Sequence, residues 1–228
     1  MSPPSTLKIK RHHSSLTGSG KYYITTPDGL WVLYTITTSS SHPELTITRH
    51  LNPIPYTEPP STTAQLSSLF SSSSSHRRTH SNPSNDLVIA TATFHTFSSK
   101  IDITLHNNQT FTMKRPDPFS SARRFNSLTP LGTLEWRSDG GVLGSLATSN
   151  MKLVDAGSQQ RTFARYEKGK VGWSGRAEAD TLMIVDDGGV GGFFDMVVIS
   201  LLATVEYKRV EKSATEGVGD AAEAVAGV

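Results

Sequence analysis

Three short motifs have residue types that could do chemistry, and none has the complete pattern that its chemistry requires. Residues 18–21 (GSGK) look like the end of a phosphate-binding loop, but Ser15 occupies the first glycine position and Tyr22 follows the lysine. His76 and His80 have the spacing of two metal ligands on a helix, with no third ligand nearby. Residues 186–189 (DDGG) lack the ligand spacing of a calcium loop. The sequence also has no nucleophile elbow and no thiol pair, so we expect a non-enzymatic protein without metal or cofactor.

The distribution of charge is more informative than these motifs. The net charge is +2, but Glu216, Asp220 and Glu223 lie in the C-terminal tail after Lys212. The rest of the chain has 22 basic and 17 acidic residues, a net charge of +5. A modestly basic body favours an anionic surface as partner, and the excess is too small to indicate nucleic acid.

Cysteine usage and the N-terminus bear on location. The chain has no cysteine, which excludes disulfides and thiolate metal sites and fits a reducing compartment. Residues 1–16 contain basic residues but not the apolar core of a secretory signal. We therefore expect an intracellular protein, either cytoplasmic or peripherally bound to a membrane.

An apolar run at residues 196–205 is the element around which the chain is organised. Only Ser200 and Thr204 carry polar atoms in this run, and both hydroxyls can bond back to helical carbonyls. A helix without a polar face must be surrounded by protein. A helix of roughly 13 residues built around this run would span about 20 Å, too little for a hydrocarbon core of about 30 Å, so we expect no transmembrane segment.

The ends of this run favour a helix, with a buried strand as the alternative. Asp195 can cap the N-terminus, and basic residues at 208–212 suit the negative end of the helix dipole. A strand stays possible because many residues of the run are β-branched, and a short apolar run cannot be assigned by periodicity. The expected core-helix residues are Met196, Val197, Val198, Ile199, Leu201, Leu202 and Val205.

Most of the preceding sequence has the alternating pattern and turn residues of antiparallel strands. Residues 27–29 (PDG) and 107–108 (NN) are typical hairpin turns between such segments. About ten strands are predicted, at residues 21–26, 30–37, 44–50, 87–97, 100–106, 109–114, 131–137, 151–155, 161–166 and 179–185.

Three segments lack the apolar residues needed to offset their ordering entropy. We expect a disordered basic arm at residues 1–20, a disordered Ser/Pro-rich insertion at 53–85 and a disordered acidic tail at 213–228. The remaining residues, 21–212, form one domain around the insertion.

Together the strands and the helix predict a mainly β (α+β) fold. A helix that is apolar on all sides needs walls all around it, and a closed barrel supplies them while removing sheet edges. The expected architecture is a closed antiparallel β-barrel of about ten to twelve strands enclosing one C-terminal hydrophobic helix.

The C-terminal half, from about Leu131, resembles fungal domains of unknown function that belong with the tubby-like C-terminal barrels. That superfamily also includes LURP-one-related proteins and phospholipid scramblases. The segments that carry the resemblance are 134–137 (LEWR), 151–155 (MKLVD), 163–166 (FARY), 182–184 (LMI) and 195–203 (DMVVISLLA), with Glu206 after them.

The resemblance implies a non-catalytic module that binds phosphoinositide headgroups or an anionic membrane surface. Several Lys and Arg side chains would converge on one face to hold phosphates by charge-assisted hydrogen bonds. The candidates are Lys114, Arg115, Arg123 and Arg124 near the middle hairpin, and Arg165, Lys168, Lys170 and Arg176 around later turns.

Three alternatives stay open for these cations and for the protein. The cations could be ordinary solvated surface charges. The protein could be an interaction scaffold whose disordered segments contact protein partners. A scramblase-like lipid-handling role is a third possibility, although those relatives place lipid-modified cysteines near the barrel and this chain has none.

Overall fold

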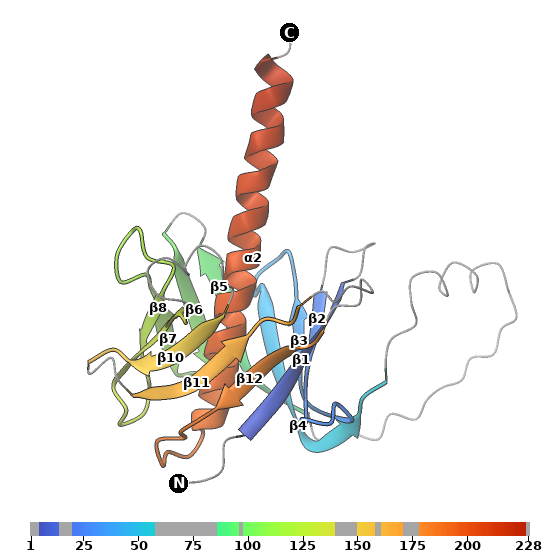
Figure 1. The fold of residues 1–228 in the computed structure, drawn as a ribbon, viewed down its shortest axis with the longest axis vertical. Helices are drawn as coiled ribbons and strands as arrows, with labels where there is room; N and C mark the ends of the chain where they lie inside the picture. Colours follow the sequence, from blue (N-terminus) through green and yellow to red (C-terminus); the bar gives the residue numbers. More distant parts are fainter. Residues whose placement is uncertain are drawn as a thin grey trace, which may run out of the picture.

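The described part of the chain folds into twelve antiparallel strands and one long helix (Figure 1). The computed structural model describes residues 5–13, 20–57, 86–95, 98–139, 150–157, 161–170 and 178–226. The strands are β1 (Ser5–His13), β2 (Gly20–Thr25), β3 (Trp31–Thr38), β4 (Leu45–Pro55), β5 (Asp86–His95), β6 (Lys100–Leu105), β7 (Thr110–Met113), β8 (Arg123–Asn126), β9 (Thr133–Ser138), β10 (Met151–Asp155), β11 (Thr162–Glu167) and β12 (Asp180–Ile184). The helix is α2 (Phe193–Ala226).

The strands form one sheet that curls into a nearly closed barrel. Its order is β7-β6-β5-β4-β3-β2-β1-β12-β11-β10-β9-β8, so β7 and β8 are the two ends that meet. They are joined by a single bridge between Lys114 and Arg124. The predicted class, a mainly β antiparallel barrel with one C-terminal helix, is confirmed.

The ten predicted strands all form, and their two turns have the expected conformations. Gly29 in the first turn has φ 76° and Asn108 in the second has φ 61°, the left-handed region that these residues tolerate. Inward side chains alternate with outward ones, as in β3, where Val32, Tyr34 and Ile36 are buried.

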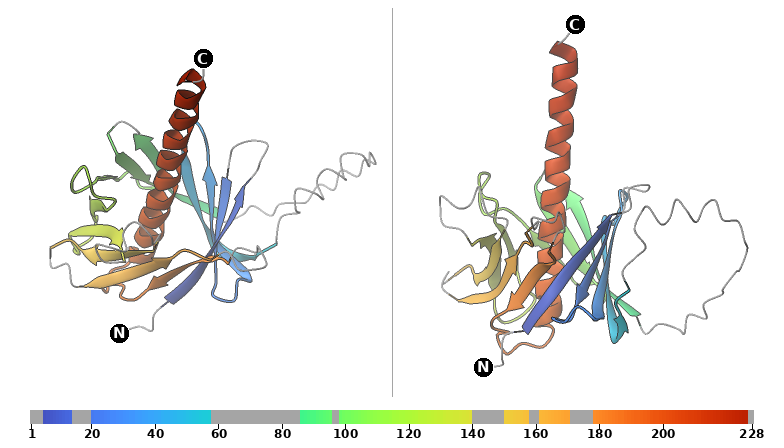
Figure 2. Two further views of the ribbon diagram at one scale, coloured as in Figure 1. Left: turned by 45° about the horizontal axis from the view of Figure 1, so that its top comes forward. Right: turned by 45° about the vertical axis from the view of Figure 1, so that its right-hand side comes forward.

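Helix α2 passes through the barrel, with strands on all its sides (Figures 1 and 2). The apolar run is therefore a helix and not a strand, as its end signals favour. Six of its seven expected core residues are buried, and the seventh, Val205, is partly buried and packs against the core. Each such burial contributes about 1.5 to 3 kcal/mol to stability.

The two hydroxyls of the run are satisfied inside the barrel. Ser200 donates to the carbonyl of Val197 at 3.3 Å and accepts the indole N–H of Trp136 at 2.9 Å. Thr204 donates to the carbonyl of Ser200 at 2.8 Å. Back-bonding to helical carbonyls removes the cost of burying these polar groups, as predicted.

Helix α2 is much longer than the predicted core helix and extends beyond the strands (Figure 1). The prediction of a disordered acidic tail at 213–228 is therefore wrong as far as Ala226. The tail is rich in alanine, a strong helix former, and it continues a helix that the core has already nucleated. Within the described residues, no helix combines the length and hydrophobicity needed to cross a bilayer.

The disordered arm predicted at 1–20 is also wrong for residues 5–13, which form β1. This strand pairs with β12 on one side and with β2 on the other, and it buries Leu7 and Ile9. Two buried aliphatic residues suffice because the strand is central in the sheet and gains ladder hydrogen bonds on both edges. The rest of the arm lies outside the described residues.

The predicted insertion at 53–85 begins later than expected. Strand β4 runs through Pro55, where Trp31 and Pro55 are paired across β3 and β4. Residues 58–85 lie outside the described residues.

Candidate anion-binding site

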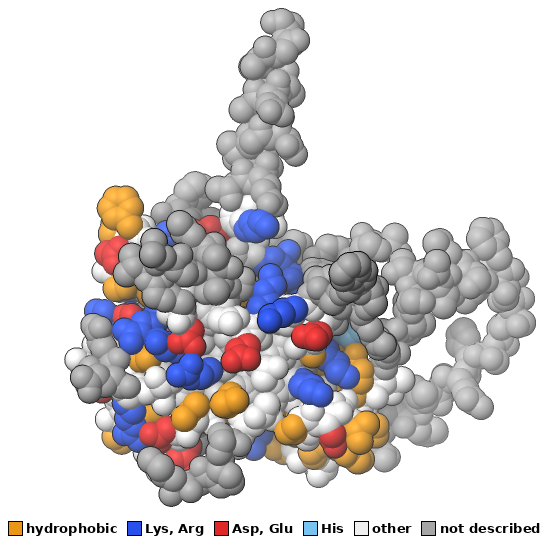
Figure 3. Space-filling view, viewed as in Figure 1, with side chains coloured by type: hydrophobic (Ala, Val, Ile, Leu, Met, Phe, Trp, Pro, Cys, Tyr) orange, Lys and Arg blue, Asp and Glu red, His pale blue; other side chains and the backbone are white. Residues whose placement is uncertain are grey.

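Three cations surround one carboxylate at the end of the barrel where α2 leaves it. We call Arg115, Arg123, Lys208 and Glu211 the exit cluster. Glu211 accepts a hydrogen bond from Arg115, and its second oxygen lies 3.9 Å from Nη2 of Arg123. On the face of the barrel seen in Figure 3, other Lys and Arg side chains also lie on the surface below the point where α2 leaves it.

Arg123 is the least exposed member of the exit cluster, with 1% of its side chain exposed. The alternation of β8 places Arg123 and Phe125 inside the barrel and Arg124 and Asn126 outside. Its guanidinium lies 4.7 Å from the centre of the Tyr207 ring, a cation–π contact. Its Nη1 donates to the carbonyl of Ala122 at 3.3 Å.

Two polar atoms of this cluster lack partners. Nε of Arg115 and Nε of Arg123 are buried and have no hydrogen-bond partner within the described residues. An unpaired buried donor on a charged group costs more than a neutral one. A ligand oxygen that reached either Nε would remove that cost.

Lys208 adds a third positive charge on the helix. Its Nζ lies 3.2 Å from Sδ of Met151, which is a weak acceptor. Burial, followed by the charge of Arg123, lowers the pKa of Lys208, while Glu211 acts in the opposite direction. Burial and then the charge of Arg115 likewise lower the pKa of Arg123. One carboxylate therefore does not balance these three cations, and the cluster favours a further anion.

The loop between β7 and β8 carries the other basic residues of the first predicted group. Lys114 and Arg124 form the bridge at its base, with N···O distances of 2.9 and 2.8 Å. Both side chains are exposed, and Arg124 pairs with Glu135 at 2.8 Å. Phe119, in the middle of the loop, is 99% exposed. The loop therefore has one exposed aromatic side chain between two pairs of basic residues, at 114–115 and 123–124.

The structure thus brings the first predicted group to one end of the barrel. Its members are Lys114, Arg115, Arg123 and Arg124. Arg123 differs from the prediction in one respect, because it lies in the interior and not on the surface.

The second predicted group is not part of the exit cluster. Arg165 pairs with Asp139 at 2.7 Å, an acid that also pairs with Lys152. Lys168 and Lys170 are exposed beyond the end of β11. Arg176 lies outside the described residues.

Sequence reasoning did not include Lys208, Glu211 or Phe119 among the site residues. In the sequence, Lys208 is only a cation at the end of a helix. Glu211 is 96 positions from its partner Arg115, so no local pattern connects the two. Phe119 follows Pro116 and Pro118 in a loop, where no periodicity marks it. The alternation in residues 122–126 (ARRFN) does contain a signal, since it places Arg123 on the same side as Phe125.

A second polar cluster on α2, one and a half turns before the first, is complete. Glu206 is buried and accepts hydrogen bonds from the Tyr22 hydroxyl at 2.5 Å and from Nε of Arg209 at 2.8 Å. It also forms an ion pair with Nη2 of Arg209 at 2.6 Å. Burial, followed by the charge of Glu206, raises the pKa of Tyr22, which holds it as a neutral donor. This cluster has a structural role.

No group of three or more His, Asp or Glu residues is close enough to hold a metal within the described residues. Protein-family models, curated proteins and solved structures give no match to this chain. The candidate site therefore rests on its geometry.

Proposed function

We propose that this chain is a non-catalytic, tubby-like barrel that binds phosphoinositides or other anionic phospholipids at the exit cluster and the β7–β8 loop. The observation that carries the proposal is the surplus of positive charge around Glu211, next to an exposed phenylalanine. The twelve-stranded barrel around a C-terminal helix is compatible with the resemblance to tubby-like domains.

A headgroup phosphate would take the place of the Glu211 carboxylate. Arg115 can present a planar pair of donors to a phosphate, and Arg123 and Lys208 add charge behind it. The Glu211 side chain is 40% exposed, so it can turn to solvent when a phosphate displaces it. Lys114 and Arg124 at the base of the loop would attract the surrounding lipid headgroups.

Phe119 would supply the apolar part of the interaction. Moving a fully exposed phenylalanine from water into the boundary of the acyl chains contributes about 1.5 to 3 kcal/mol. Charge and burial then act on the same side of the barrel, which is the pairing that stable peripheral binding requires.

The test is co-sedimentation of the purified protein with vesicles of phosphatidylcholine alone or with added phosphatidylinositol bisphosphate, at low and high salt. We expect binding to the anionic vesicles only, weakened by salt. Arg115→Ala should reduce the affinity about fivefold, on the scale of about 1 kcal/mol for each cation near the surface. Phe119→Ala should reduce it about tenfold or more.

Arg165→Ala is the matched control, because it removes an exposed arginine that is paired outside the exit cluster. Its affinity should stay within about twofold of the unmodified protein. Absence of binding to the anionic vesicles, or an equal loss from Arg115→Ala and Arg165→Ala, would contradict the proposal.

A role as a protein-interaction scaffold is a second candidate function. The observation that favours it is the incomplete junction between β7 and β8, which presents strand edges of the kind that bind peptides.

A further inference from the structure

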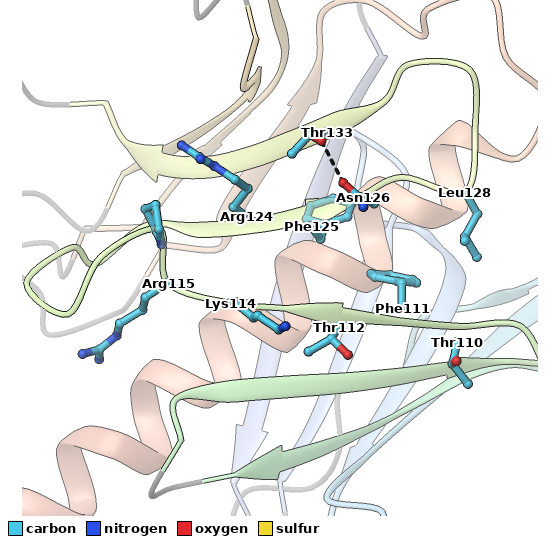
Figure 4. A pocket seen from close by; sticks show the side chains of 11 residues that line it. Thr110, Phe111, Thr112, Lys114, Arg115, Arg124, Phe125, Asn126, Leu128 and Thr133 are labelled. Atoms are coloured by element: carbon cyan, nitrogen blue, oxygen red, sulfur yellow. Dashed lines mark hydrogen bonds between the residues drawn. The ribbon is translucent and has the colours of Figure 1, made fainter.

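The barrel has one incomplete junction, between β7 and β8. Eleven neighbouring strand pairs are joined by ladders of at least four residue pairs each. Across the described residues, the junction of β7 with β8 has the Lys114–Arg124 bridge alone. Beyond that bridge the two strands diverge (Figure 4). We call this junction the seam.

Backbone polar groups face the seam without a strand to pair with. Successive residues of a strand direct their N–H and C=O groups to alternate sides. Because Lys114 bonds across the seam to β8, Thr112 and Thr110 direct their backbone groups the same way. By the same alternation, Asn126 on β8 faces β7. An open edge of this kind is a template for another strand.

A groove of about 620 Å³ lies along the seam. Phe111 and Phe125 are part of its lining, and their ring centroids are 5.4 Å apart. The Thr133 hydroxyl donates to Oδ1 of Asn126 at 2.7 Å, so that wall of the groove is ordered (Figure 4). Apolar rings between two polar walls suit a peptide strand in which apolar and polar side chains alternate.

The groove is basic at the end where the strands meet. Lys114, Arg115 and Arg124 line it there, and the acids paired with two of them are Glu211 and Glu135. Lys114 lies on the exposed outer face of the barrel. The charge at this end therefore complements an acidic group on a bound chain.

We propose that the seam binds an extended, acidic peptide segment of another protein as an additional strand. Its backbone pairs with the edge of β7 at Thr110 and Thr112, one of its side chains covers the phenylalanine pair, and its acidic end lies near Lys114.

The open backbone edge selects a peptide over an acyl chain. A lipid chain in the groove would remove water from the backbone groups of β7 without replacing their hydrogen bonds, which costs free energy. A strand replaces each of those bonds. The seam shares Lys114, Arg115 and Arg124 with the proposed headgroup site. Its test contains no lipid, so the two proposals can fail separately.

The test is selection of a phage-displayed library of random peptides of about eight residues on the whole protein. We expect enrichment of sequences that alternate apolar and polar residues and carry Asp or Glu near one end. The best sequence is then synthesised, and its affinity is measured by calorimetry against three comparisons.

The first comparison is Thr112→Pro, which removes one backbone donor that faces the seam and is tolerated at such an edge. Thr112→Val keeps that donor and is the matched control. Both variants lose the Thr112 hydroxyl that donates to Asp102, so the affinity should fall about tenfold further with Thr112→Pro than with Thr112→Val.

The second comparison leaves the protein unaltered, in case Thr112→Pro does not fold. The same peptide with N-methyl groups on the residues that pair should lose about tenfold or more in affinity. The third comparison is Lys114→Glu. This variant should bind the acidic peptide more weakly, and it should bind more tightly the same peptide with lysine in place of its acidic residue. Failure to enrich any sequence, or equal binding of the N-methylated peptide, overturns the proposal.

Discussion

Helix α2 carries two clusters built from glutamate and arginine, and they differ in charge balance and exposure. At Glu206 one carboxylate accepts two hydrogen bonds, from Tyr22 and Arg209, and pairs with the Arg209 charge, and its side chain is 2% exposed. At Glu211 one carboxylate pairs with Arg115, lies near Arg123 and acts on Lys208 through its charge, and its side chain is 40% exposed. The same residue types thus form a complete structural cluster at one position and an incomplete, accessible one at the next. Excess positive charge beside solvent, and not charge alone, makes the second cluster the candidate anion site.

Stability should separate the two clusters most strongly. Glu206→Ala leaves the buried Tyr22 hydroxyl and the Arg209 guanidinium without their acceptor, and we expect a loss of about 3 kcal/mol in the free energy of unfolding. Glu211→Ala should cost less than about 1 kcal/mol, because Glu211 is partly exposed. Urea denaturation measures both, and equal losses would contradict the distinction.

Removing a cation from the exit cluster should leave the stability of the fold intact and should weaken vesicle binding. Arg123→Met replaces a buried, incompletely paired charge with an apolar side chain, so stability should be unchanged or should rise by about 1 to 2 kcal/mol. Binding to anionic vesicles should fall at least about fivefold. Thermal unfolding and co-sedimentation provide the two values. A loss of stability as large as that of Glu206→Ala would show that Arg123 is structural.

The pH dependence of stability should report on Lys208. Its folded pKa lies below its ordinary value of 10.5, so between the two values the unfolded chain binds a proton that the folded chain does not. Stability therefore rises with pH through that window, and the cost of the buried charge is fully present below it.

Lys208→Met should remove this rise, and the difference between the two proteins across a pH series of urea denaturations isolates it. The comparison is needed because burial raises the pKa of Tyr22, Tyr34 and Tyr166, which lowers stability at high pH. If the stability of the two proteins depended on pH in the same way, the lowered pKa of Lys208 in the folded state would be contradicted.

The smallest effect expected is a gain of affinity. Glu211→Gln removes the internal carboxylate that occupies Arg115, so binding to vesicles with phosphatidylinositol bisphosphate should tighten about threefold. Asp186→Asn is the control, since it removes an acid paired with Arg161 outside the proposed binding surface. Weaker binding of Glu211→Gln would show that this carboxylate does not compete with the ligand.

Much of the fold follows from the sequence because its signals are local. The apolar run that ends at Val205 lacks a polar face, and this alone requires walls on every side. Strand β1 escaped prediction because it has few apolar residues, and β8 because Arg123 and Arg124 resemble a surface patch. Both strands depend on pairing with distant segments, a preference that residue types alone do not reveal.

The exit cluster could be predicted only in part. Arg115 and Arg123 are close in sequence, and their neighbourhood was expected. Lys208 and Glu211 reach them because α2 passes through the barrel and leaves beside β8. That meeting depends on strand order and on where the barrel closes, and neither is encoded in a local pattern.

The most direct test follows the arginine Nε–H resonances by NMR while soluble inositol trisphosphate is added to the whole protein. Arg123 has a buried Nε without a partner among the described residues, whereas Nε of Arg209 already donates to Glu206. We predict that the Arg123 resonance shifts and exchanges more slowly with water, while that of Arg209 does not change. No change at Arg123, or equal changes at both arginines, would contradict an anion site at the exit cluster.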